Sequence, residues 1–67
     1  MSIAKITEIS CTSTVSFEDA ISKGIQRAHK TIRNIRSAWI KEQQVRVSKG
    51  SITEYQVNMM VTFVIDD

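Results

Sequence analysis

Proline is absent from this sequence, glycine occurs twice, and cysteine, histidine and tryptophan occur once each. Without a second cysteine, Cys11 cannot form a disulfide within the chain. With His29 as the single histidine, the chain has too few ligands for a structural zinc site. The 67 residues predict one domain, residues 1–67, which would bury only about 60% of its unfolded surface. Because small domains usually need a covalent link, a metal or partner subunits, we expect self-association.

Long apolar runs are absent as well. No stretch approaches the roughly 18 apolar residues of a membrane span, and Met1 to Cys11 lacks the apolar run of a secretory signal. We therefore expect a cytoplasmic protein with no membrane partner. The formal net charge of +2 is too small to indicate nucleic acid by itself.

Basic residues nevertheless recur three or four positions apart in the middle of the chain, at Lys23, Arg27, Lys30, Arg33 and Arg36. This spacing favours a solvated helix face, and a phosphate-facing surface is the alternative. We expect no nucleic-acid partner. We also expect no enzyme, because Cys11 has no neighbouring base in the sequence and His29 sits among basic residues.

The first half of the chain predicts a strand followed by a long helix. Residues Ala4 to Ile9 alternate in polarity as a strand does, and the hydroxyl-rich run at 10–16 is typical of a loop. Ser16 is suited to cap a helix, and an apolar stripe then runs from Phe17 to Ile35. Gly24 falls on this stripe, which indicates a close backbone approach to a strand or a neighbouring subunit.

The second half predicts a hairpin. Val45 and Val47 alternate with polar residues, and 48–51 form a turn in which Gly50 can take a positive φ. From Tyr55 to Ile65 every second residue is apolar and falls on one face, with Met60 and Val64 as apolar exceptions on the other. The order strand, helix, strand, strand predicts an α+β fold, a three-stranded antiparallel sheet packed on one long helix. The opposite face of the last strand suits a subunit interface or a ligand site, because it mixes polar and apolar residues: Gln56, Asn58, Met60 and Thr62.

Three segments together resemble the dodecins over essentially the whole chain. They are "SCTSTVSFEDAI" at 10–21, "RAHKTIRNI" at 27–35 and "TEYQVNMMVTFVID" at 53–66. The resemblance implies a hollow homododecamer that stores or sequesters flavin (FMN, riboflavin or its breakdown products) in pairs at two-fold interfaces, without being an enzyme. It also implies that some members bind coenzyme A.

The resemblance further implies the residues of a flavin site. Gln56 matches the family glutamine that hydrogen-bonds the polar edge of the ring. Ser37 stands where flavin-binding members carry a stacking tryptophan, and Gln44 stands where bacterial members carry an arginine. Trp39 lies two residues after Ser37, so on a strand it would face the same side, about 6–7 Å away. Arg46 is the nearest cation for a phosphate tail, provided that a bulge between Ile40 and Val45 turns it to that side.

Alternatives remain open at each of these positions. Trp39 can stack on a shifted flavin or anchor a subunit interface, and Gln56 can be an interface hydrogen-bonder. A family subgroup that lacks the tryptophan is linked to calcium, so a flavin-free shell that binds calcium or another small ligand is the second hypothesis. The candidate carboxylates show no EF-hand spacing, and they are Glu8, Glu18, Asp19, Glu42, Glu54, Asp66 and Asp67.

Overall fold

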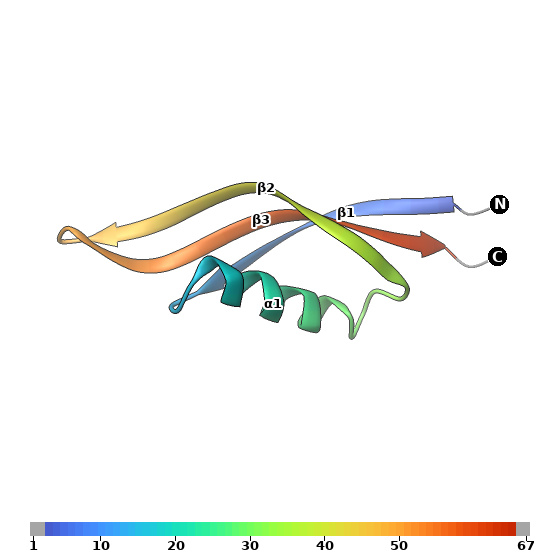
Figure 1. Ribbon diagram of the computed structural model, residues 1–67, viewed down its shortest axis with the longest axis horizontal. Helices are drawn as coiled ribbons and strands as arrows, with labels where there is room; N and C mark the ends of the chain where they lie inside the picture. Colours follow the sequence, from blue (N-terminus) through green and yellow to red (C-terminus); the bar gives the residue numbers. More distant parts are fainter. Residues whose placement is uncertain (1–2, 66–67) are drawn as a thin grey trace.

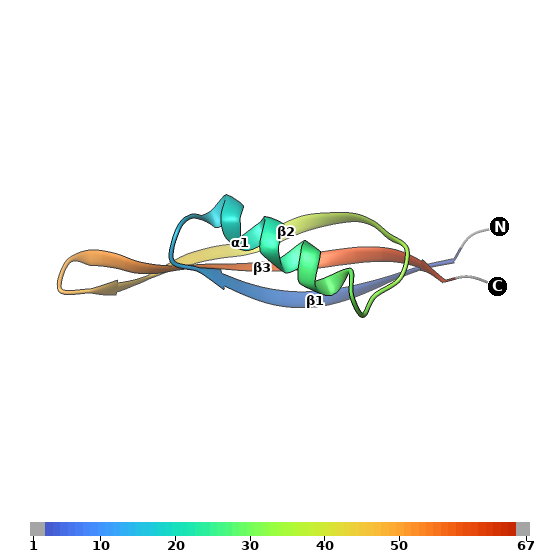
Figure 2. The same ribbon diagram turned by 90° about the horizontal axis from the view of Figure 1, so that it is seen from below.

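The computed structural model describes residues 3–65. Its elements follow in the order β1 (Ile3–Ser13), α1 (Phe17–Ala28), β2 (Ile35–Ser48) and β3 (Ser51–Ile65). The strands form one antiparallel sheet in the order β1-β3-β2, and α1 lies along one face of it (Figures 1 and 2). The predicted α+β fold with three antiparallel strands is therefore confirmed.

β1 is longer than its sequence pattern predicts. The prediction of a loop from residue 10 is wrong, because Ser10 to Ser13 continue the strand and pair with Asn58 to Tyr55 of β3. Backbone hydrogen bonds to the partner strand β3 stabilise this segment as a strand, and the hydroxyl-rich composition of the segment does not predict such pairing. The connection to α1 is short, and Ser16 caps the helix as predicted, accepting a hydrogen bond from the Asp19 amide at 2.9 Å.

α1 is shorter than predicted. It ends at Ala28, with His29 as its C-cap, so Ile32 and Ile35 do not belong to the helix. The chain leaves the helix through a turn that contains Asn34 at φ 60°, a left-handed conformation that asparagine tolerates. Ile35 then pairs with Phe63 as the first residue of β2. Ile35 therefore packs as a strand residue and is not the last residue of the apolar helix stripe that the spacing predicted.

The shorter helix also changes the interpretation of the basic residues. Only Lys23 and Arg27 lie on α1, and Arg27 occupies its last turn. Lys30 and Arg33 lie beyond the helix, and Arg36 lies in β2. The five basic residues therefore form no continuous helix face.

The β2–β3 hairpin turns where the sequence predicts. Lys49 and Gly50 form the tip, with φ values of 51° and 79°. Nothing lies within 4 Å of the position of a Cβ on Gly50, so the glycine serves the left-handed backbone rather than a close contact. The hairpin projects well beyond the end of α1 (Figure 1).

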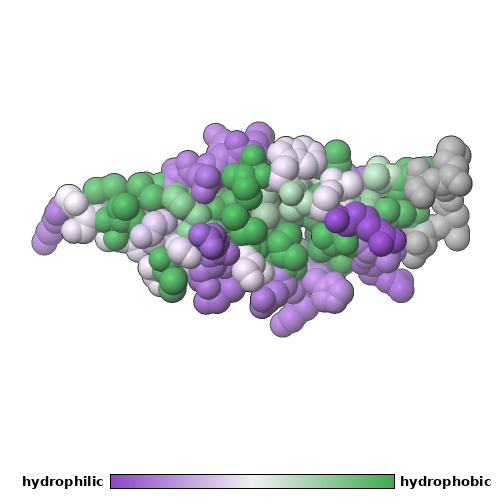
Figure 3. Space-filling model, viewed as in Figure 1, coloured by the Kyte–Doolittle hydropathy of each residue, from purple (hydrophilic) through white to green (hydrophobic). Residues whose placement is uncertain are grey.

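The core between α1 and the sheet is small. Its fully buried members are Ala20, Val57, Met59 and Val61. The backbone at Gly24 approaches β1 closely, as predicted: an added Cβ would fall on the sulfur of Cys11 and lie 2.9 Å from Cε of Met59. Several large apolar side chains stay exposed, including Val47 and Ile52 on the hairpin, and apolar side chains gather along this arm as well as over the centre (Figure 3). A small core with exposed apolar side chains fits the expected self-association.

Candidate functional site

The sheet has one face that α1 leaves uncovered. Val57, Met59 and Val61 point into the core below α1, so the intervening residues of β3 project to the opposite side. We call this side the open face and define it by the side chains that the strand register places there: Ala4, Ile6, Glu8, Ser10 and Thr12 of β1, Ser37, Trp39, Glu42, Gln44 and Arg46 of β2, and Glu54, Gln56, Asn58, Met60, Thr62 and Val64 of β3.

A bulge in β2 decides which residues reach the open face. Ile40 pairs with Met59 and Glu42 pairs with Asn58, so Lys41 is an extra residue between two steps of β3. The predicted bulge between Ile40 and Val45 is thereby confirmed. Because the alternation is shifted by one residue at this point, Arg46 projects to the same side as Trp39.

All five residues that the sequence predicts for the flavin site therefore lie on the open face, spread along its length from Ser37 to Arg46. Ser37 lies opposite Thr62, Trp39 opposite Met60, and Gln44 opposite Gln56. Trp39 is 48% exposed, so its indole is available to a ligand or to another subunit. Arg46 reaches across to the neighbouring strand, where its guanidinium contacts Gln56 and Glu54.

Gln56 is the centre of a hydrogen-bond network on this face. Its Nε2 donates to Oγ of Ser10 at 3.1 Å and to Oδ1 of Asn58 at 3.4 Å. Its Oε1 accepts from Nη2 of Arg46 at 3.3 Å. Asn58 in turn donates through Nδ2 to Oε1 of Glu42 at 3.1 Å. The partners Ser10 and Glu42 lie on other strands, and sequence reasoning did not assign them to the site because only the strand register shows that they are neighbours.

The carboxylates do not gather into a metal site within residues 3–65, where no group of three histidine, cysteine, aspartate or glutamate residues could hold an ion. Most of them have other partners. Glu8 pairs with Nζ of Lys41 at 3.2 Å and Glu54 with Nε of Arg46 at 3.3 Å, while Asp19 pairs with Lys23. Asp66 and Asp67, also predicted as candidates, lie outside the described residues.

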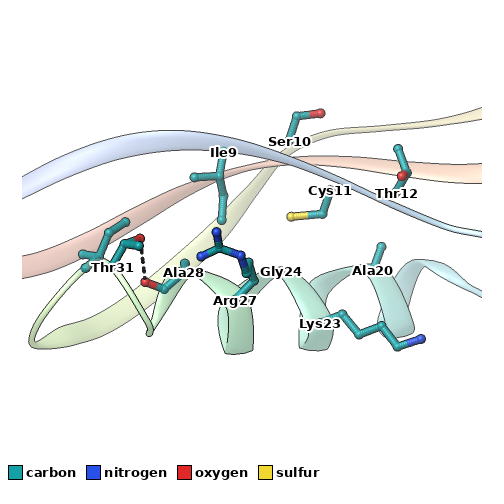
Figure 4. A pocket seen from close by; sticks show the side chains of 11 residues that line it. Ile9, Ser10, Cys11, Thr12, Ala20, Lys23, Gly24, Arg27, Ala28 and Thr31 are labelled. Carbon is teal, nitrogen blue, oxygen red and sulfur yellow. Dashed lines mark hydrogen bonds between the residues drawn. The ribbon is translucent and has the colours of Figure 1, made fainter.

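A groove of about 350 Å³ lies on the other side of the sheet, between β1 and α1. In Figure 4, Ile9 and Cys11 point from β1 toward α1, near Gly24 and Ala28, whereas Ser10 points away from the helix. Burial raises the pKa of the Cys11 thiol above its ordinary 9.0, so this cysteine is not activated as a nucleophile. None of the five predicted site residues lines the groove, although Ser10 and Thr12, whose side chains we place on the open face, also border it.

A single helix on one face of a three-stranded antiparallel sheet, with the opposite face left open, defines a small α+β protein. The chain belongs to the dodecin family, whose family model matches residues 3–66. Family membership implies oligomeric assembly and places the chain among small binding and storage proteins rather than known enzymes. Within residues 3–65, no helix is long and apolar enough to cross a membrane.

Relatives from several bacteria support this assignment. The chain is 33% identical over 63 residues to the calcium dodecin of Mycobacterium tuberculosis, a match that covers 94% of this chain and 89% of the relative. A crystal structure of an arginine-to-alanine mutant of the T. thermophilus dodecin is 30% identical, with a TM-score of 0.94 over the whole of both chains. The crystal structure of the M. tuberculosis protein, described as calcium-chelating with a novel calcium-binding site, has a TM-score of 0.82 and covers 97% of this chain and 93% of its own.

Proposed function

We propose that this chain binds a flavin, FMN or riboflavin, on the open face and stores it without chemical conversion. The flavin would lie at an interface between subunits of a hollow homododecamer. The observation that carries the proposal is the bulge at Lys41, which gathers Trp39, Arg46 and Gln56 on one face. A large flat ring, a cation and a carboxamide on one face are complementary to the flat ring and the polar edge of a flavin.

Two of the site residues define how this flavin site would differ from that of other members. Ser37 offers no ring, so the stacking surface would come from Trp39, two residues along the same face. Gln44 carries no charge, so the cation would come from Arg46, also two residues along. Both replacements lie further toward the hairpin tip than the residues they replace, and the flavin would be displaced in that direction.

Riboflavin emission tests the proposal directly. Titration of purified protein into riboflavin should quench the emission, and Gln56→Leu should weaken the affinity about tenfold, because hydrogen bonds to the ring edge would be lost. Glu18→Gln, an exposed change on α1, serves as the control and should leave the affinity unchanged. Emission that stays constant at micromolar protein would contradict the proposal.

The two roles open to Trp39 are separated by measuring assembly and binding on the same variant. If Trp39 stacks on the ligand, Trp39→Ala should sediment as the wild-type assembly and bind riboflavin more weakly. If Trp39 anchors an interface between subunits, where tryptophan is enriched, the same variant should sediment as smaller species. The 48% exposure of the side chain within one subunit is compatible with both roles.

Calcium binding is the second candidate function, favoured by the identity of 33% to the M. tuberculosis calcium dodecin. Residues 3–65 of one subunit hold no cluster of ligands, so we propose that a calcium site would combine carboxylates from more than one subunit or include Asp66 and Asp67. Calcium should then raise the melting temperature by binding the folded assembly, while magnesium at the same concentration should not.

Coenzyme A binding and a cytoplasmic location stay predictions from the sequence.

A further inference from the structure

Four side chains of the open face form a continuous chain of hydrogen bonds, which we call the amide relay: Arg46, Gln56, Asn58 and Glu42. The guanidinium of Arg46 donates to Oε1 of Gln56 at 3.3 Å. Nε2 of Gln56 donates to Oδ1 of Asn58 at 3.4 Å. Nδ2 of Asn58 then donates to Oε1 of Glu42 at 3.1 Å.

The chemistry of the two ends fixes the direction of the amide relay. A guanidinium can only donate hydrogen bonds, and an ionised carboxylate can only accept them. Because Glu42 only accepts, Asn58 must turn its amino group toward Glu42 and its oxygen toward Gln56. Because Arg46 only donates, Gln56 must turn its oxygen toward Arg46. The two requirements agree, so both amides have one favoured orientation rather than two.

This orientation determines what Gln56 can still offer to a ligand. The two N–H bonds of its amino group are directed at Ser10 and Asn58. One lone pair of its oxygen is taken by Arg46, and no other group of residues 3–65 donates to the second. Arg46 uses Nη2 for Gln56 and Nε for Glu54, so further guanidinium N–H groups remain beside it. The face therefore presents an acceptor next to a donor.

We infer that Asn58 and Glu42 are positioning residues that hold Gln56 as a hydrogen-bond acceptor, and that the site selects heterocycles with an N–H beside a carbonyl. The N–H of such an imide or lactam edge donates to Gln56, and the adjacent carbonyl accepts from Arg46. This inference rests on the proposed function, since a flavin carries an edge of this kind. It adds which atom of Gln56 the ligand meets and which residues set that choice.

A carboxylate in place of the amide tests the direction of the relay. In Gln56→Glu, the carboxylate at position 56 can only accept hydrogen bonds, yet the group that Asn58 turns toward it is also an acceptor, its amide oxygen. Asn58 cannot turn its amino group to position 56 instead, because that amino group donates to Glu42. Riboflavin affinity should fall about tenfold, as expected for an unsatisfied polar pair. Adding Glu42→Gln frees Asn58 to turn and donate to residue 56. Because a carboxylate still accepts from the ligand N–H, the double variant should recover riboflavin affinity to within about threefold of wild type.

The matched control is Gln56→Glu with Glu54→Gln. The second substitution removes the Glu54 carboxylate, which contacts Arg46 but lies outside the amide relay. It therefore relieves repulsion between the carboxylates at positions 54 and 56 without freeing Asn58 to turn. Affinity should stay low. Recovery in this control equal to that with Glu42→Gln, or no recovery with Glu42→Gln, would overturn the inference.

Wild-type protein supplies a second test that needs no variant to fold. Riboflavin methylated at the imide nitrogen has lost the N–H, so it should bind about tenfold more weakly than riboflavin. Equal binding of the two compounds would overturn the inference and leave the proposed function standing. Binding of neither compound would overturn both.

Discussion

Trp39 and Arg46 project from the same face of β2 although seven positions separate them. In a regular strand an odd separation places two side chains on opposite faces. The extra residue Lys41 corrects the alternation, because Ile40 and Glu42 pair with adjacent residues of β3. The composition of the open face thus depends on one inserted residue rather than on the types of residue around it.

Deleting one residue from β2 should therefore have opposite effects at two nearby positions. Deletion of Lys41 removes the extra residue, leaves every remaining pair in register and should preserve riboflavin binding within a few-fold. It also removes the exposed Lys41–Glu8 ion pair, which contributes at most about 1 kcal/mol. The emission titration and the melting temperature measure both effects.

Deletion of Ala38 is the matched control for this experiment. The register can be restored by using up the bulge at Lys41, which turns Trp39 to the face below α1, where Ala38 now lies opposite Val61. It can also be restored by using up the irregularity between Ile35 and Ser37, which turns Ser37 to that face instead. Both outcomes remove a predicted flavin-site residue from the open face. Riboflavin binding should be lost or the fold disrupted. Equal behaviour of the two deletions would contradict the role assigned to the bulge.

Restoring an indole at position 37 should strengthen flavin binding. Ser37 lies on the open face opposite Thr62, so Ser37→Trp places a second flat ring beside the site. An aromatic pair adds about 0.5–1.5 kcal/mol beyond its burial, which predicts an affinity about 2- to 13-fold higher by titration. Lys49→Trp at the hairpin tip adds the same ring away from the site and should change nothing. An unchanged affinity in Ser37→Trp would show that the ligand does not reach this position.

Gly24→Ala should destabilise the protein, although alanine is the better helix former by about 1 kcal/mol. The new Cβ falls on the sulfur of Cys11 and lies 2.9 Å from Cε of Met59, and overpacking of this kind costs about 1–3 kcal/mol. The melting temperature should fall, and adding Cys11→Ala should recover part of the loss by removing the sulfur. Ser22→Ala, at an exposed position on the same helix, is the control that changes helix propensity without adding a contact in the core. A higher melting temperature in Gly24→Ala would contradict the close packing.

Acid should weaken the junction between β1 and α1. The hydroxyl of Ser13, which donates to Oδ2 of Asp19 at 2.6 Å, is the largest cause that lowers the pKa of Asp19 below its ordinary 3.8. Burial opposes it to a smaller extent, and Lys23 contributes further lowering. Because the pKa is lower in the folded state, the stabilisation is present above about pH 3.8 and is lost as the pH falls through the folded value.

Melting temperatures measured from about pH 6 down to about pH 3 test this expectation. Ser13→Ala should make the decrease shallower, because the hydroxyl is the largest cause of the shift. Asp19→Asn should remove the contribution of this group altogether. If the melting temperature of Asp19→Asn fell with decreasing pH as steeply as that of the wild type, the loss of stability in acid would come from other carboxylates.

The strands and the helix cap could be predicted from local patterns, but two boundaries could not. Ser10 to Ser13 form a strand because β3 lies beside them, and Ile35 leaves the helical stripe because Phe63 offers it a partner. Both outcomes depend on pairing between residues far apart in the sequence, which local propensity does not contain. For the site, the same limit applies to Ser10 and Glu42, whose contacts with Gln56 and Asn58 span strands.

The sequence by itself determined the order of the elements, the cap at Ser16 and the turn at Gly50, and it led us to expect self-association and to name candidate residues for a ligand site. These features follow from short-range periodicity, backbone preference, chain length and a resemblance carried by the whole chain. Only the tertiary structure decided that Trp39, Arg46 and Gln56 share one face, and that Gln56 is held with a fixed orientation. Both depend on how β2 is placed against β3, and a strand register is fixed by the packing of the whole sheet rather than by either strand alone.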